Sequence, residues 1–154
     1  MTEAAHREGG SEHDHDLRVR RHSPSGGRGF DVAADPQTQL AWDPGTLRSI
    51  EKLTPGLLGQ GSRYRGDLKG SDVVEYEYVE FDRPRRFAHR ADVKLGRIRH
   101  VFTFDPVPEG TRLTQEAHLR RNFLGRLMGP LATRFVRKRF RVIASELGTY
   151  LASR

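Results

Sequence analysis

The sequence predicts an α+β domain in which a curved antiparallel sheet of about seven strands wraps around a long C-terminal helix. Two observations support this fold class. From about residue 46 to 119, segments that alternate apolar and polar residues are separated by turn signals, which is typical of a β-meander. From residue 122 to 153, apolar residues recur every three or four positions, as they do on one face of a helix. We therefore expect an apolar pocket between the sheet and this helix.

The composition is that of one ordinary domain. The chain has 154 residues, of which 35% are hydrophobic. We expect residues 1–15 to be a disordered tail, because they show no apolar periodicity, and residues 16–154 to form one ligand-binding domain. No segment approaches the ~18 consecutive apolar residues of a membrane span, and the N-terminus lacks the apolar stretch of a signal peptide. These features predict a cytoplasmic protein.

Several kinds of chemistry are excluded by the residue types present. The sequence has no cysteine, so disulfides, thiolate nucleophiles and cysteine-ligated metal centres are ruled out. We find no glycine-rich phosphate loop, His-Glu-x-x-His motif, Ser/His/Asp set or pair of catalytic carboxylates. We therefore expect no cofactor and no metal site, which leaves oxygen and imidazole groups for any reaction.

The first part of the domain is predicted to contain one strand and two short helices. Residues 17–22 alternate apolar and basic side chains as an edge strand does. Asp-Pro pairs at 35–36 and 43–44 end two helical segments, because proline ends one helix and suits the first turn of another. Three glycines between residues 26 and 29 should weaken the first helix, since each costs up to ~1 kcal/mol relative to alanine.

The remaining elements follow from the change in periodicity. We expect strands at about 46–53, 61–69, 73–82, 86–94, 97–104 and 111–119. The connections are short, so consecutive strands should pair antiparallel. The C-terminal helix should be kinked or divided at Gly129-Pro130. Its apolar stripe is predicted to comprise Leu124, Leu127, Met128, Leu131, Phe135, Val136, Phe140, Ile143, Leu147, Tyr150 and Leu151.

Alternation along the strands places polar-tipped side chains on the inner face of the sheet. They are Tyr64, Tyr76, Tyr78, His89, His100 and Gln115. Val79 and Phe81 break the parity of their strand, which predicts a β-bulge. Each buried polar group without a partner costs ~1–3 kcal/mol, so this set needs an explanation.

Two interpretations of the inner polar groups remain open. They satisfy one another in a structural core, or they line a cavity for an apolar ligand that carries a few oxygens. On the second interpretation, the predicted ligand-binding residues are Trp42, Tyr64, Tyr76, Tyr78, Phe87, His89, His100, Phe102, Gln115, Met128 and Phe135.

His89, His100 and Tyr76 are also candidate catalytic residues. Imidazole titrates near neutral pH, and a phenol can donate a hydrogen bond to a developing oxyanion. These groups could therefore act as base and acid on an enolisable carbonyl compound. The residue types permit this chemistry without requiring it, so binding without catalysis stays the leading hypothesis.

Positive charge is concentrated near the C-terminus. The net charge is +7, and residues 120–154 contain nine Lys or Arg but a single acidic residue, Glu146. The basic residues that interrupt the apolar stripe should face away from the core; they are Arg134, Arg137, Lys138, Arg139 and Arg141. Such a face either keeps the protein soluble or binds an acidic carrier protein or an anionic membrane. We do not expect nucleic-acid binding, because no recognition motif is present.

Five segments, taken in order, carry a resemblance to a known superfamily. They are FDVAADPQTQLAWDP (30–44), PGLLGQGSRYR (55–65), VEFDRPRRFAHRA (79–91), FTFDPVPEGTRLTQE (102–116) and ASELGTYLAS (144–153). With these segments the chain resembles the SRPBCC (START/Bet v 1-like) superfamily, and in particular its polyketide cyclase/dehydrase branch, over roughly residues 17–154. Residues 23–35 depart from the usual pattern, in which the first helix is more apolar.

The resemblance implies a helix-grip fold with a deep hydrophobic cavity. Members of the superfamily bind lipids, sterols, polyketides or other hydrophobic metabolites, and some cyclise or dehydrate aromatic polyketides. The branch has no universal catalytic motif, so the resemblance assigns no catalytic residue by position. It implies binding of a small hydrophobic molecule, with an aromatase/cyclase-like activity as the alternative.

Overall fold

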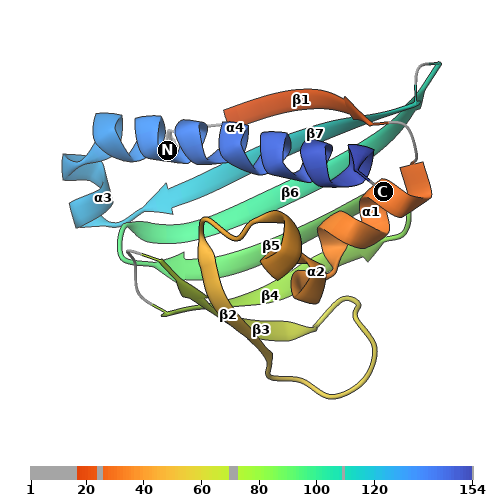
Figure 1. Ribbon diagram of the computed structural model, residues 1–154. Coiled ribbons are helices and arrows are strands. Elements are labelled where there is room, and N and C mark those ends of the chain that lie inside the picture. Colours follow the sequence, from red (N-terminus) through yellow and green to blue (C-terminus); the bar gives the residue numbers. More distant parts are fainter. Residues whose placement is uncertain (1–16, 24–25, 70–72, 109, 154) are drawn as a thin grey trace, which may run out of the picture.

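The computed structural model describes residues 17–23, 26–69, 73–108 and 110–153. The predicted tail at 1–15 lies outside these residues. In chain order, the elements are β1 (Leu17–Ser23), α1 (Gly26–Ala34), α2 (Pro36–Trp42), β2 (Leu47–Lys52), β3 (Arg63–Leu68), β4 (Val73–Asp82), β5 (Arg86–Val93), β6 (Gly96–Val107), β7 (Gly110–Arg121), α3 (Phe123–Leu127) and α4 (Gly129–Ala152) (Figure 1). This order confirms the predicted α+β helix-grip architecture.

The strands of the described residues form one seven-stranded sheet in the order β1-β7-β6-β5-β4-β3-β2. Every neighbouring pair is antiparallel. The chain passes from the β1 edge to the β2 edge through α1 and α2, while α4 lies across one face of the curved sheet (Figure 1). No helix in the described part of the chain combines the length and apolar character that crossing a bilayer requires.

The predicted strand boundaries agree with the structure to within about two residues, except at the end of β6. That strand continues to Val107, because Pro106 and Val107 pair with Thr111 and Gly110 of β7. The expected loop is therefore a tight hairpin. The register of β4 against β5 shifts between Tyr78 and Glu80, which confirms the predicted bulge.

The glycine-rich segment forms the helix α1 because its one large apolar side chain is fully buried. Phe30 has no exposed surface, and its ring packs edge-on against Phe81, Phe87 and Phe104 at centroid distances of 5.4, 5.5 and 5.4 Å. Burying one phenylalanine contributes ~1.5–3 kcal/mol, enough to offset the weak helix propensity of the glycines. Asp35 then caps α2, its Oδ1 accepting a hydrogen bond from the Gln37 N–H at 2.9 Å.

The C-terminal segment is divided as predicted, but only part of the predicted apolar stripe is buried. The side chains that α4 buries against the sheet are Phe140, Ile143, Leu147 and Leu151. The predicted stripe residues Leu124, Leu127, Met128, Leu131 and Phe135 are exposed instead. Leu131 and Phe140 are nine positions apart, which is roughly two and a half helical turns, so they point to opposite sides of α4.

Replacing Phe30 with alanine tests whether its burial holds α1 in place. We expect Phe30→Ala to lower the free energy of unfolding by ~3–5 kcal/mol, because the change removes a buried ring and leaves a cavity. The matched control is Phe123→Ala, whose ring is 86% exposed, and it should change stability by less than ~0.5 kcal/mol. Urea unfolding followed by circular dichroism measures both. Equal losses would contradict this account of α1.

Candidate functional site

A cavity of about 230 Å³ lies between the inner face of the sheet and the helices α2 and α4. The predicted site residues that line it are Trp42, Tyr76, Tyr78, Phe87, His89, His100 and Phe102. Most of the remaining wall is apolar and includes Leu68, Val74, Ala91, Val93 and Ile98. The alternation along β4, β5 and β6 therefore brings together the side chains that the sequence predicted to be internal.

Four of the predicted binding residues do not line this cavity. Tyr64 is buried behind the wall, where its ring stacks on that of Tyr76 at 5.7 Å. Gln115 is fully buried on β7, paired in register with Phe102. Met128 and Phe135 are 41% and 71% exposed, so the prediction that they face the ligand is wrong. Met128 is the cap residue between α3 and α4, and Phe135 lies on the solvent side of α4.

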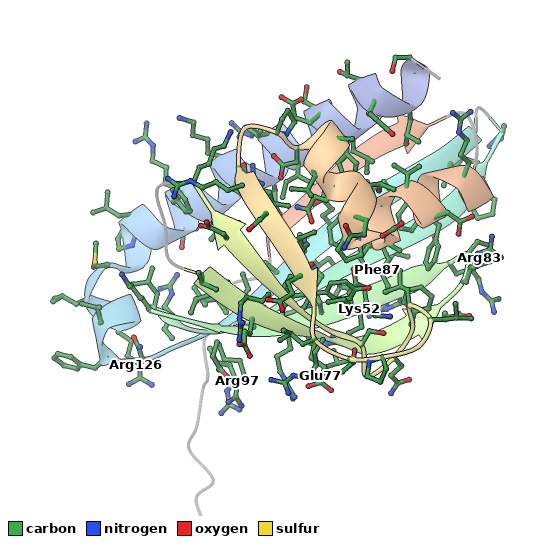
Figure 2. The ribbon with its side chains drawn as sticks, turned by 60° about the horizontal axis from the view of Figure 1, so that its bottom comes forward. Lys52, Glu77, Arg83, Phe87, Arg97 and Arg126 are labelled. Carbon is green, nitrogen blue, oxygen red and sulfur yellow. The ribbon has the colours of Figure 1, made fainter. Side chains whose placement is uncertain are left out.

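Charged side chains are sorted to the outer face of the sheet. In Figure 2, Glu77 and Arg97 project from the side of the sheet that faces away from α4, whereas Phe87 lies between the sheet and the helices. On this outer face Arg65 and Glu75 form a cross-strand ion pair at 2.7 Å. Exposed pairs of this kind contribute little to stability, because solvent screens them. Solvation and ion pairing explain the charged side chains of the outer face, but they do not explain the polar side chains inside the cavity.

The two cavity histidines are neutral at physiological pH. The rings of His89 and His100 meet edge to face at 5.1 Å, and His100 stacks on Phe140 of α4 at 4.4 Å. Burial lowers the pKa of His89 to about 4. Burial also lowers the pKa of His100 well below its usual value. Electrostatic interaction with His89 and Arg139 lowers this pKa further, whereas the polar contact with Gln115 opposes the shift. Each neutral imidazole offers one donor and one acceptor nitrogen.

The tyrosines next to the histidines stay protonated. Burial raises the pKa of both Tyr76 and Tyr78 above that of a free phenol. The Tyr78 hydroxyl donates a hydrogen bond to the Ala34 carbonyl at 2.7 Å, so it is committed to holding α1. The Tyr76 ring lies 5.2 Å from that of His89, with both residues on the cavity wall. Tyr76 is therefore the phenol best placed to act beside His89.

Several buried polar atoms of this region have no hydrogen-bond partner within the described residues. They are Trp42 Nε1, His100 Nε2 and both amide atoms of Gln115, although Gln115 lies close enough to His100 to oppose the lowering of its pKa. The indole nitrogen can only donate, and a buried donor left unpaired costs ~1–3 kcal/mol. Trp42 and His100 both line the cavity. Their unpaired state is therefore consistent with hydrogen bonding to a ligand oxygen.

An ion pair with a buried carboxylate joins the two helices that bound the cavity. Asp43 directly follows α2 and is 1% exposed, and its carboxylate is paired with the guanidinium of Arg139 from α4. One of the contacts joins Arg139 Nη1 and Asp43 Oδ1 at 3.3 Å, and Gln39 Nε2 donates to Asp43 Oδ2 at 3.3 Å. Arg139 lines the cavity, so the prediction that it belongs to the outward basic face is wrong.

Sequence reasoning missed this pair because it took Asp43 only as part of an Asp-Pro turn. A carboxylate that directly follows a tryptophan at a helix end was the available signal, but its partner is 96 residues away. Among the described residues, no group of three or more His, Asp or Glu side chains could hold a metal ion. The chemistry available in the cavity is thus that of neutral imidazoles, phenols, one indole and one paired guanidinium.

Comparison with known proteins agrees with this architecture. A family model described as "Polyketide cyclase / dehydrase and lipid transport" matches residues 28–152. The solved structure of Ara h 8.0201 has a TM-score of 0.74 and 12% sequence identity, covering 92% of this chain and 99% of that one. The solved structure of TTHA0849 from Thermus thermophilus has a TM-score of 0.72 and 18% identity, covering 90% of this chain and 97% of that one.

A further similar structure is CalU16 from Micromonospora echinospora, with a TM-score of 0.61 and 17% identity over 88% of this chain and 72% of that one. At these identities the likeness shows a shared fold. No curated protein sequence matches the chain significantly.

The low pKa of His89 predicts a specific loss of stability in acid. His89 has a pKa of about 4 in the folded protein against 6.5 for the free group, so the unfolded chain takes up the proton first as the pH falls through this window. The free energy of unfolding should therefore decrease between about pH 6.5 and 4, by up to ~3 kcal/mol from His89 alone. Urea unfolding at several pH values should show a smaller acid loss in His89→Phe. Parallel pH profiles for the two proteins would contradict a His89 that is neutral in the folded protein.

Proposed function

Because the chain belongs to the polyketide cyclase/dehydrase and lipid transport family, within the SRPBCC superfamily, we propose that it binds a small hydrophobic molecule, such as a lipid or a polyketide. The observation that carries this proposal is the cavity itself, whose wall is mostly aliphatic and aromatic. Pockets of this composition, with a few placed polar groups, are typical of small-molecule sites. The cavity volume of about 230 Å³ lies just below the ~300–1,000 Å³ range of such sites, which favours a compact ligand.

The polar groups of the wall favour a ligand with an oxygen at one end. Trp42 and His100 have unpaired buried nitrogens, and Arg139 has further N–H donors besides those that face Asp43. Asp43 is already paired, so the carboxylate beside the cavity does not repel an oxygen acceptor. A carbonyl, hydroxyl or phenolate oxygen would satisfy these donors, while the hydrocarbon part would contact the aliphatic wall.

A second function, acid–base catalysis, is favoured by the placement of His89 and Tyr76. Neutral His89 could accept a proton from the carbon beside a bound carbonyl, and the electron pair of that C–H bond would then form the C=C bond of an enolate. Tyr76 stays protonated and could donate a hydrogen bond to the enolate oxygen. The His89 pKa of about 4 makes it a weak base at neutral pH, so binding without turnover is the first proposal.

A pair of matched compounds tests the binding proposal. Tetralin is a two-ring hydrocarbon, and 2-tetralone is the same skeleton with one carbonyl oxygen. We expect both to bind, with 2-tetralone about fivefold tighter because of one added hydrogen bond. Trp42 is the sole tryptophan, so its indole N–H signal in a ¹H–¹⁵N spectrum reports directly on the cavity. Only 2-tetralone should move the indole proton downfield, as a new hydrogen bond does.

A filled cavity is the control for this experiment. Ala91 is 7% exposed on the wall, and Ala91→Leu should abolish binding of both compounds. Ala41→Leu, at an exposed position of α2, should bind as the original protein does. Failure of the folded protein to bind either compound would contradict the proposal. Deuterium uptake by 2-tetralone in D₂O that exceeds the buffer rate and disappears in His89→Phe would establish the catalytic function as well.

A further inference from the structure

Six large apolar side chains are exposed on a short stretch that the binding cavity does not use. They are Phe123, Leu124, Leu127, Met128, Leu131 and Phe135, between 41% and 86% exposed. We name these six residues the α3–α4 patch. Single exposed apolar residues are ordinary on a protein surface, whereas six within thirteen positions form a cluster. The patch therefore needs a physical explanation.

The α3–α4 patch is held in place by specific contacts. The Asn122 side chain donates to the Lys94 carbonyl at 2.8 Å and accepts from the Gly125 N–H at 2.8 Å. Its backbone N–H donates to the Leu95 carbonyl at 3.1 Å. A Cβ on Gly125 would lie 2.1 Å from the Leu95 oxygen, so α3 packs directly on the turn between β5 and β6. The apolar side chains of α3 therefore project from a helical turn that is fixed against the β5–β6 turn.

Basic side chains accompany the apolar ones. Arg134 and Lys138 follow Leu131 and Phe135 by three positions each, which makes them neighbours on the surface of α4. Arg134, Arg137, Lys138 and Arg141 line one shared depression, and Arg126 belongs to α3 at the same end of the molecule (Figure 2). Within the described residues, no acidic side chain forms an ion pair with any of these five.

The combination of exposed apolar and basic side chains favours one kind of partner. An acidic protein would use the cations but leave the exposed phenylalanines and leucines without a role. A bilayer uses both sets, because apolar side chains enter the boundary between headgroups and acyl chains while Lys and Arg contact anionic headgroups. We infer that the α3–α4 patch and its flanking cations dock the protein onto an anionic lipid bilayer.

The position of the patch connects it to the cavity. The hairpin that anchors α3 carries Val93 and Ile98 on the cavity wall, and Arg139 lies one helical turn after Phe135. Figure 1 shows α3 and the start of α4 at the end of the sheet where β5 turns into β6. Docking there would place the bilayer beside one end of the cavity. The transfer of a ligand between bilayer and cavity rests on the proposed function, whereas the docking itself does not.

Vesicle flotation of the full chain tests the inference. We expect binding to phosphatidylcholine vesicles that contain a quarter phosphatidylglycerol, at least tenfold weaker binding to pure phosphatidylcholine, and weaker binding at about 500 mM than at about 50 mM NaCl. Leu127→Ser/Phe135→Ser and Arg134→Gln/Lys138→Gln should each weaken binding at least about tenfold. The matched controls alter exposed residues elsewhere, Leu57→Ser/Val73→Ser and Arg28→Gln/Arg48→Gln, and should change it less than about twofold.

Four results would overturn the inference. The first is no binding of the folded protein to anionic vesicles, and the second is an equal loss of binding in the patch and control variants. The third is salt-sensitive binding that Leu127→Ser/Phe135→Ser leaves intact. The fourth is a dimer in size-exclusion chromatography that this variant dissociates. The third would mean charge attraction alone, as for an acidic protein partner, and the fourth a second copy of the chain on the patch. Tetralone binding measured on the same variants should be unchanged, so loss of docking is distinguishable from failure of the cavity proposal.

Discussion

The ion pair between Asp43 and Arg139 is the interaction on which the cavity depends. α4 packs along β1 at one edge of the sheet, and α2 packs along β2 at the opposite edge. Between these edges the two helices cover the inner faces of the central strands, where Phe140 of α4 stacks on His100 of β6. Asp43 and Arg139 join α2 to α4 beside the cavity that lies between the helices and the sheet. Burying a charge such as the Asp43 carboxylate costs several kcal/mol before pairing, and an apolar pair often packs as well or better. Retaining the charges is therefore consistent with a role for the Arg139 guanidinium as a hydrogen-bond donor in the cavity wall.

The electrostatic state of the cavity follows from the same burial. Desolvation keeps His89 and His100 neutral and the phenols of Tyr76 and Tyr78 protonated. Asp43 and Arg139 cancel each other. Although many of its residues are ionisable, the wall therefore presents no net charge at neutral pH. Such a wall accepts an uncharged hydrophobic molecule and still offers hydrogen-bond donors to an oxygen, which is the basis of the proposed function.

The architecture and most of the cavity wall could be predicted from the sequence, because both depend on local periodicity. Alternation placed His89, His100 and Phe102 correctly, and the broken parity at Val79 located the bulge. These features are set by neighbouring residues in one strand. The resemblance to a known superfamily then supplied the way in which sheet and helix enclose a space.

The errors concern residues whose orientation depends on distant contacts. Met128 and Phe135 were predicted to face the ligand, but the docking of Gly125 against Leu95 fixes the break between the helices and turns both residues outward. Arg139 was predicted to face solvent, but a carboxylate 96 residues away draws it into the wall. Periodicity within one helix carries no information about either contact.

Intermolecular nuclear Overhauser effects between 2-tetralone and the methyl groups of the protein would locate the bound ligand. If the ligand occupies the cavity, its aliphatic and ring protons will show contacts to Val74, Ala91, Val93 and Ile98, which line the wall from three strands. Contacts confined to exposed methyl groups such as those of Leu127 and Leu131 would show that the hydrophobic molecule binds the surface, and would contradict the account of the cavity as the binding site.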